Sequence, residues 1–131
     1  MRRLLLSEAM SAADYVDLLR TRSEMIARMR FVAAPYDALL APAVPVIAPP
    51  VAAMETDDDA FARMNGMVLR NTALFNFLDC AALSIPCHRA GEAPVGLMVI
   101  GSGGSDARVL AAGLAIEAVV SPQIAPGRDP A

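Results

Sequence analysis

Residues 70–101 read RNTALFNFLDCAALSIPCHRAGEAPVGLMVIG, and this stretch decides the fold. It contains two short apolar runs, residues 81–86 and 94–101, which are rich in branched side chains and bounded by Pro or Gly. Such runs favour buried strands over helices. The loop around Gly91 is short enough for the two strands to pair as antiparallel neighbours. The residues before the first run predict the end of a helix.

The chain before this hairpin predicts a helix and a third strand. Ser11 and Asp14 have the spacing of a capping box, and apolar residues at helical spacing then predict a helix over residues 12–31. The apolar run at residues 36–41 predicts a third buried strand. The proline-rich segment that follows, up to Pro50, predicts an extended loop.

A second helix should lead into the hairpin. Thr56 and the three aspartates after it predict its cap and first turn, and the apolar pattern continues to about residue 78. In an alternative with two shorter helices, Gly66 or Asn71 interrupts it.

A last helix should follow the hairpin, capped by Ser105 or Asp106 and ended by Pro122. Together these elements predict an α/β fold, with a small mixed sheet of about three strands flanked by helices.

Length and composition predict one domain over residues 1–131, with flexible ends at residues 1–10 and 122–131. The sequence is 56% hydrophobic, which is more than one small domain can hide. Some apolar surface is therefore expected to meet a partner chain or another part of a larger protein. The open edges of a small sheet are the expected place.

The charge pattern argues against nucleic-acid binding. The net charge is −3, all 11 basic residues are arginines, and Trp is absent, so neither a phosphate-neutralising face nor a stacking platform is expected. No apolar run reaches the length of a membrane span or of a signal-peptide core. Cys80 and Cys87 bracket the first hairpin strand, about 20 Å apart and beyond disulfide reach. These features predict a cytoplasmic protein with reduced cysteines.

Three motifs, taken in order, resemble the C-terminal part of amidase signature enzymes. They are Arg-x-Thr-x-x-x-Asn at residues 70–76, Ala-Leu-Ser-Ile-Pro at residues 82–86, and Pro-Val-Gly-Leu at residues 94–97. With Tyr-Asp-Ala-Leu-Leu-Ala-Pro at residues 36–42, the similarity covers roughly residues 11–120. The resemblance implies a C-terminal portion of that family's α/β/α fold, and serine hydrolases that cleave amide C–N bonds.

Two departures from the family pattern bear on the argument. Asp79 stands where the family often has glycine, just before the first hairpin strand. Leu69 stands where members that act as the glutamine-dependent amidotransferase subunit tend to carry an acid. The resemblance therefore favours a general amidase of unknown substrate.

The family's catalytic groups cannot be assembled from this sequence. The family uses a serine nucleophile, a second serine in a cis peptide, and a lysine as the ultimate base. A serine hydroxyl needs an adjacent base, and arginine cannot accept the proton because its guanidinium stays charged. Since the sequence contains no lysine, we expect no catalytic residue and no amide hydrolysis by this chain alone.

Three other features of the sequence suggest chemistry, and a structural role is favoured for each. His88 is the only histidine, and an exposed loop histidine is favoured over a dyad with Cys87 or Ser84, because adjacent extended residues point to opposite faces. Residues 101–105 are interpreted as a strand-to-helix turn, with an anion-binding site or a nucleophile as alternatives. The aspartates at residues 57–59 are favoured as a helix cap over a metal site. We expect no cofactor and no metal.

Thr72 and Asn76 are the candidate substrate-binding residues. They are four positions apart and share a helix face just before the first hairpin strand. The resemblance implies that this segment lies close to the substrate cleft. The alternative is that both residues tie down backbone where the helix meets the sheet.

The sequence thus predicts a C-terminal segment of an amidase that lacks the Ser-Ser-Lys machinery. The alternative is a non-catalytic interaction module that dimerises or docks on a separate chain through its exposed sheet edge. The expected partner is a second copy or a chain that carries the missing amidase half, with no nucleic acid and no membrane.

Overall fold

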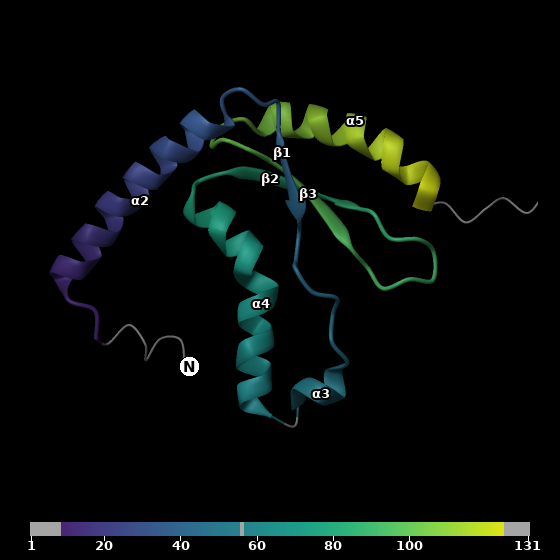
Figure 1. The fold of residues 1–131 in the computed structure, drawn as a ribbon, viewed down its shortest axis with the longest axis horizontal. Coiled ribbons are helices and arrows are strands. Elements are labelled where there is room, and N and C mark those ends of the chain that lie inside the picture. The colour runs from purple at the N-terminus through teal and green to yellow at the C-terminus, as the bar shows by residue number, and fades with distance from the viewer. Residues whose placement is uncertain (1–8, 56, 125–131) are drawn as a thin grey trace, which may run out of the picture.

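The computed structural model describes residues 9–55 and 57–124. Its elements are α2 (Ala12–Ala33), β1 (Leu39–Pro42), α3 (Val51–Glu55), α4 (Asp58–Phe77), β2 (Ala81–Pro86), β3 (Gly96–Gly101) and α5 (Asp106–Ile124). Helix α5 runs along one small sheet, while α2 and α4 extend away from it (Figure 1). The predicted α/β class is therefore confirmed.

The sheet has three strands in the order β1-β3-β2, and both neighbouring pairs are antiparallel. In the central strand β3, Val99 lies opposite Leu40 of β1 and Leu83 of β2. The predicted hairpin is confirmed, and β2 has the predicted bounds. The predicted mixed sheet is wrong for the part of the chain that the structure describes, because β3 separates the two strands that run in the same direction.

Helix α5 covers one face of the sheet and builds the core there. The side chains of Ile85, Val99 and Val109 form the buried cluster. Half-buried residues pack against it, namely Ala38, Ala81, Leu83, Ala112 and Ile116. Gly113 allows α5 to lie close to β2, since a Cβ at that position would collide with the Leu83 side chain.

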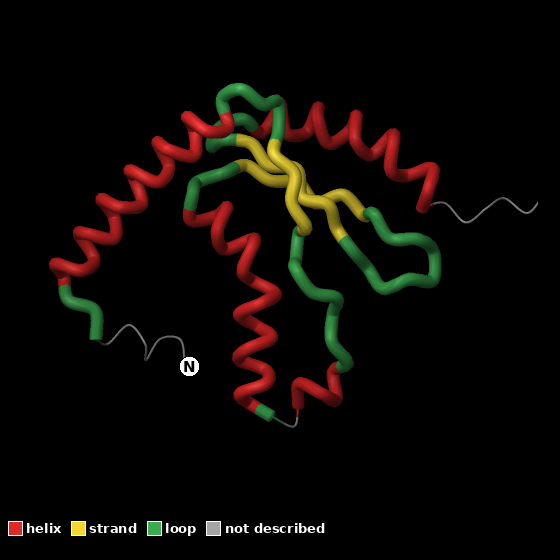
Figure 2. The backbone as a smooth tube through the Cα atoms, in the orientation of Figure 1, coloured by secondary structure: helices red, strands yellow, loops and turns green. Residues whose placement is uncertain are grey.

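The opposite face of the sheet meets the C-terminal end of α4, which continues through a short loop into β2 (Figure 2). On β3, Met98 and Ile100 are buried on this side, because alternate residues of a strand point to opposite faces. The side-chain amide of Asn71 donates to the carbonyl oxygen of Pro42 at 2.8 Å, which ties α4 to the end of β1.

Burial of the strands differs from the sequence prediction. All three strands were expected to be buried, but only β3 is buried over most of its length. β1 and β2 alternate between covered and exposed residues, and Tyr36 is exposed and precedes β1. The prediction is wrong for these two strands because each occupies an open edge of the sheet.

The helix starts follow from their caps. α2 begins with the predicted capping box, in which the Asp14 amide donates to Ser11 Oγ at 3.1 Å and the Ser11 amide donates to the Asp14 carboxylate at 2.9 Å. α4 is capped by Asp57, while Thr56 lies outside the described residues. α4 runs through Gly66 and Asn71, so the alternative with two helices is wrong.

The end of α5 also differs from the prediction. Pro122 was expected to end the helix, but α5 continues to Ile124, so residues 122–124 belong to it. Proline lacks the N–H of one helical hydrogen bond, so the last turn of α5 is held by fewer hydrogen bonds than a turn without proline. Of the predicted flexible ends at residues 1–10 and 122–131, residues 1–8 and 125–131 lie outside the described residues. The short helix α3 was not predicted.

The expected surplus of apolar surface is present. Among the described residues, seven hydrophobic side chains are buried, whereas nineteen large hydrophobic side chains are exposed. Many of the exposed ones lie on α2, which extends away from the sheet (Figure 1).

Candidate functional site

An open hollow of about 380 Å³ lies where the end of α4 meets the sheet. Its lining residues come from α4, the α4–β2 loop and the sheet: Thr72, Phe75, Asn76, Asp79, Cys80, Ala82 and Met98. The structure therefore brings both predicted binding residues, Thr72 and Asn76, into the same hollow. Their role in binding remains a prediction.

The two residues differ in how much of their bonding capacity is used. Thr72 Oγ1 donates to the carbonyl oxygen of Leu69 at 3.2 Å, which leaves the hydroxyl oxygen able to accept a hydrogen bond from a ligand. The Asn76 side chain is exposed, and its backbone carbonyl accepts from the amides of Leu78 and Asp79. Asn76 thus helps to end α4 through its backbone and offers its amide to the hollow.

Asp79 is a residue of this hollow that sequence reasoning did not select. Its φ of 58° lies in the left-handed region, which non-glycine residues seldom adopt. The Cys80 amide donates to Phe75 O at 3.0 Å and the Asp79 amide donates to Asn76 O at 3.1 Å, the two bonds of a Schellman helix end. The sequence did contain a signal for Asp79, because this residue occupies a position where the resembled family often has glycine.

The Asp79 carboxylate lies between two arginines of α2. Its oxygens are 3.9 Å from Arg22 and 3.8 Å from Arg30, and the Arg22 guanidinium also lies 5.8 Å from the centre of the Phe77 ring. These contacts hold the C-terminal half of α2 near one rim of the hollow.

Cys80 lines the hollow but is a poor nucleophile. Burial is the main cause that raises the pKa of its thiol, and the neighbouring Asp79 charge raises it further. The thiol therefore stays protonated near neutral pH. Cys80 and Cys87 are both free, as predicted.

His88 is held by contacts with the backbone of Val95, the residue just before β3. His88 Nδ1 lies 3.3 Å from the amide nitrogen of Val95, and Cys87 Sγ donates to Val95 O at 3.5 Å. His88 is half-buried, so the expectation of an exposed histidine is wrong. The reason is this contact with Val95 across the hairpin. Within residues 9–55 and 57–124, no hydrogen bond joins His88 to Cys87 or Ser84.

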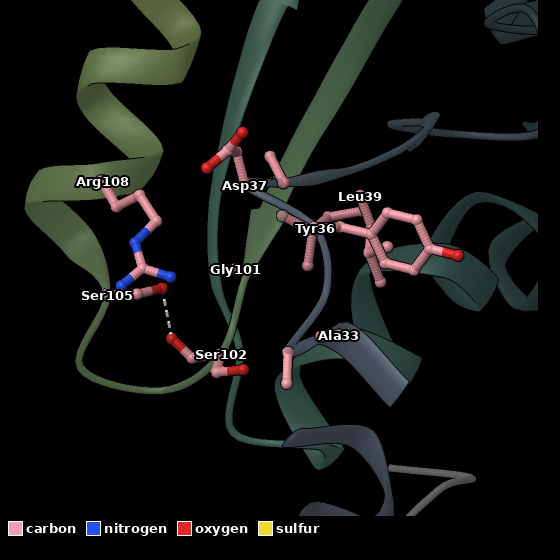
Figure 3. Close-up of a pocket in the computed structure, with 11 residues that line it drawn as sticks. Ala33, Tyr36, Asp37, Leu39, Gly101, Ser102, Ser105 and Arg108 are labelled. Carbon is pink, nitrogen blue, oxygen red and sulfur yellow. Dashed lines mark hydrogen bonds between the residues drawn. The ribbon is translucent and has the colours of Figure 1, made fainter. Parts of the chain in front are cut away.

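The glycine- and serine-rich segment forms the predicted turn between β3 and α5. Ser105 Oγ donates to Ser102 O at 2.6 Å, and a Cβ at Gly101 would collide with Ser105 and Val109. Figure 3 shows the adjoining pocket, which Arg108 and Asp37 also line. Its volume of about 50 Å³ has room for a few water molecules. The close packing of Ser105 and Val109 on this backbone therefore explains why residue 101 is a glycine.

The three adjacent aspartates serve the helix start. Asp57 accepts from the amides of Asp59 and Ala60 at 2.8 and 3.0 Å. These two hydrogen bonds lower the pKa of the Asp57 carboxyl. In the described part of the chain, no group of three His, Cys, Asp or Glu side chains is placed to hold a metal ion.

The length and apolar character of the helices in the described residues decide whether one of them can span a membrane. None of them is both long enough and apolar enough to cross a bilayer.

Comparisons with known proteins agree on one family. A family model described as Amidase matches residues 1–110. A protein whose solved structure is titled "Crystal structure of amidase" superposes with a TM-score of 0.68 and 30% identity, over 89% of this chain and 27% of that one.

Two relatives are similar over a shorter range. The 2-amino-5-chloromuconic acid deaminase of Comamonas testosteroni is 36% identical over 85 residues, which are 64% of this chain and 18% of that protein. The "Uncharacterized protein in nthA 5'region" of Rhodococcus erythropolis is 33% identical over 82 residues, which are 63% of this chain and 41% of that protein. The match therefore spans less than half the length of each of these three proteins.

Proposed function

Because the chain belongs to the amidase family, we propose that it forms the C-terminal part of an amidase and lacks, by itself, the groups that hydrolyse amides. The family membership confirms the resemblance of the motifs in the sequence. The observation that carries the proposal of inactivity is the absence of lysine from all 131 residues.

The chemical reason is the need for a proton acceptor. A serine hydroxyl attacks a carbonyl carbon efficiently only when a nearby base takes its proton. The 11 arginines cannot act in this way, because their guanidinium groups remain protonated. The single histidine, His88, already has Nδ1 against the Val95 amide.

In a complete amidase, this segment would complete the sheet and form part of one wall of the substrate cleft. Thr72 and Asn76 line the hollow at the α4–β2 junction, and both have hydrogen-bonding capacity that suits a carboxamide. The Comamonas testosteroni relative is named a deaminase of 2-amino-5-chloromuconic acid, so amino-substituted acids belong among the substrates to test.

An interaction module is the second candidate function, and the open edge of β2 favours it. Both edges lack charged side chains and end in a proline, Pro86 in β2 and Pro42 in β1, but the β2 edge has six residues and the β1 edge has four. Charges, prolines and short length normally protect sheet edges from pairing. In this function the partner is a second copy or a chain that carries the missing amidase half.

The proposal includes a cytoplasmic location. The two free cysteines support it, because reduced thiols persist in that compartment.

Reconstitution tests the proposal. The chain is mixed with a separate polypeptide that covers the part of the solved amidase outside the match and carries the serines and the lysine. We expect amide hydrolysis only when both are present. Thr72→Val and Asn76→Ala should raise KM, while the exposed Thr21→Val on α2 should leave it unchanged. Equal KM for all three variants would remove the binding role, and failure of the mixture to hydrolyse amides would count against the proposal itself.

A further inference from the structure

One apolar face of α2 is covered only in part, at residues in its C-terminal half. Toward the C-terminus, Ile26 and Met29 are half-buried and Ala33 is buried. The same face continues with exposed residues, here called the α2 stripe: Tyr15, Leu18, Leu19, Met25 and Val32, which are 38–54% exposed. At 100° per residue, the stripe and the covered residues fall within about 140° of the helix circumference, as in a helix that packs on protein.

The described contacts of α2 are too weak to explain such a face. α2 has 22 residues and is about 33 Å long, and helices in proteins gain most of their stability from tertiary packing of an apolar face. It is held to the α4–β2 junction by Arg22 and Arg30 on Asp79 and by Arg22 on Phe77. These are partly exposed ion pairs with long contacts, which contribute little to stability.

We propose that the α2 stripe binds the amidase polypeptide that supplies the two serines and the lysine. The inference rests on the proposed function and adds the element through which the two polypeptides meet. The solved amidase contains a region that matches 89% of this chain, and this region is 27% of its length, so that fold continues well beyond the region. The stripe is continuous with Ala33, which is buried and lines a small pocket together with Leu39 and Ile100 of the sheet, so further amidase polypeptide would extend a face that is already partly covered.

Charge argues against a second copy as the occupant. Arg22 lies within the same face, near the middle of the stripe. An antiparallel pair of α2 helices would place two Arg22 guanidinium groups close to the symmetry axis, where they repel and where each has only a long contact of 3.9 Å to Asp79 as compensation. A polypeptide of different sequence does not meet this repulsion.

The test uses the full chain and the separate amidase polypeptide that carries the serines and the lysine. Binding is measured by titration calorimetry for the unmodified chain, Leu18→Glu, Leu19→Glu and the control Val16→Glu. Val16 is exposed on the same helix but lies outside the stripe. Circular dichroism checks that all variants keep their helix content. We expect each stripe variant to lose about tenfold or more in affinity, and the control to stay within about threefold.

The outcomes separate this inference from the proposed function. If amide hydrolysis is reconstituted and the stripe variants bind as tightly as the control, the proposed function stands and the role of α2 is overturned. If the chain dimerises in light scattering and only the stripe variants are monomeric, the occupant is a second copy and the inference is also overturned. Slower hydrogen exchange of α2 amides upon addition of the amidase polypeptide would support it independently. Absence of both binding and hydrolysis would overturn both proposals.

Discussion

Asp79 joins backbone geometry, ion pairing and the candidate site in one residue. It ends α4 in the left-handed region with φ 58°, pairs with Arg22 and Arg30 of α2, and lines the hollow with Thr72 and Asn76. Its carbonyl oxygen also lies against the β3–α5 turn, since a Cβ at Gly103 would collide with this atom. A side chain at this strained position has a use that glycine would not have, which is to hold α2.

The strain can be measured by two substitutions that both remove the carboxylate. We expect Asp79→Gly to be more stable than Asp79→Ala by about 1 kcal/mol, because only glycine adopts a positive φ without steric cost. Urea unfolding of the two variants gives this difference directly. Equal stability of the two would show that the position is not strained.

At the scale of elements, each of the three long helices is fixed by a local interaction at one end or on one face. α2 and α4 begin with side-chain caps, α4 ends in a Schellman motif, and α5 lies on β2 through Gly113. These interactions explain why the helices form where they do although the core is small.

The close packing of α5 on β2 predicts opposite effects on stability when two helical glycines are replaced by alanine. A Cβ at Gly66 in α4 meets nothing within 4 Å, so Gly66→Ala should stabilise the protein by about 0.5–1 kcal/mol through helix propensity. Gly113→Ala makes the same change but pushes against Leu83. We expect it to be less stable than Gly66→Ala by about 1 kcal/mol or more, as judged by thermal and urea unfolding. Equal gains at both positions would contradict the close packing of α5 on β2.

The cap of α4 predicts a pH dependence. Hydrogen bonds from the Ala60 and Asp59 amides lower the pKa of Asp57 in the folded protein, so this carboxylate stabilises the fold above its unfolded pKa of about 3.9. That stabilisation is lost as the pH falls through the lower folded value. Asp57→Asn keeps an accepting oxygen but does not titrate, so its stability should fall less steeply with acid. Asp58→Asn, which changes the same charge one residue away, is the control, and identical acid profiles for both variants would contradict the cap.

The sequence predicted the positions of the helices and strands more accurately than their burial and their long-range contacts. The hairpin, the capping box and the last helix start follow from local patterns of apolar residues, Gly, Pro and Ser, which the structure confirms. The burial of β1 and β2 was mispredicted because it depends on which strand is central. Short apolar runs do not reveal the order of the strands in the sheet. Asp79 was missed for a similar reason: its arginine partners are about 50 residues earlier in the chain.

For the whole molecule, the balance of surface and core supports the proposal that this chain forms part of a larger amidase unit. A buried core of seven hydrophobic side chains lies in the described residues beside nineteen exposed large ones. The match covers 18–41% of the length of the relatives and 27% of the solved amidase. Both observations fit a segment whose apolar faces are meant to be covered by more amidase polypeptide.

The most direct test of the central claim is the hydrolysis of a simple amide such as benzamide by the purified chain alone. We expect no release of ammonia above the uncatalysed background, because the sequence contains no lysine to deprotonate a serine. Turnover that persists through purification and disappears in His88→Ala or Ser84→Ala would contradict the account.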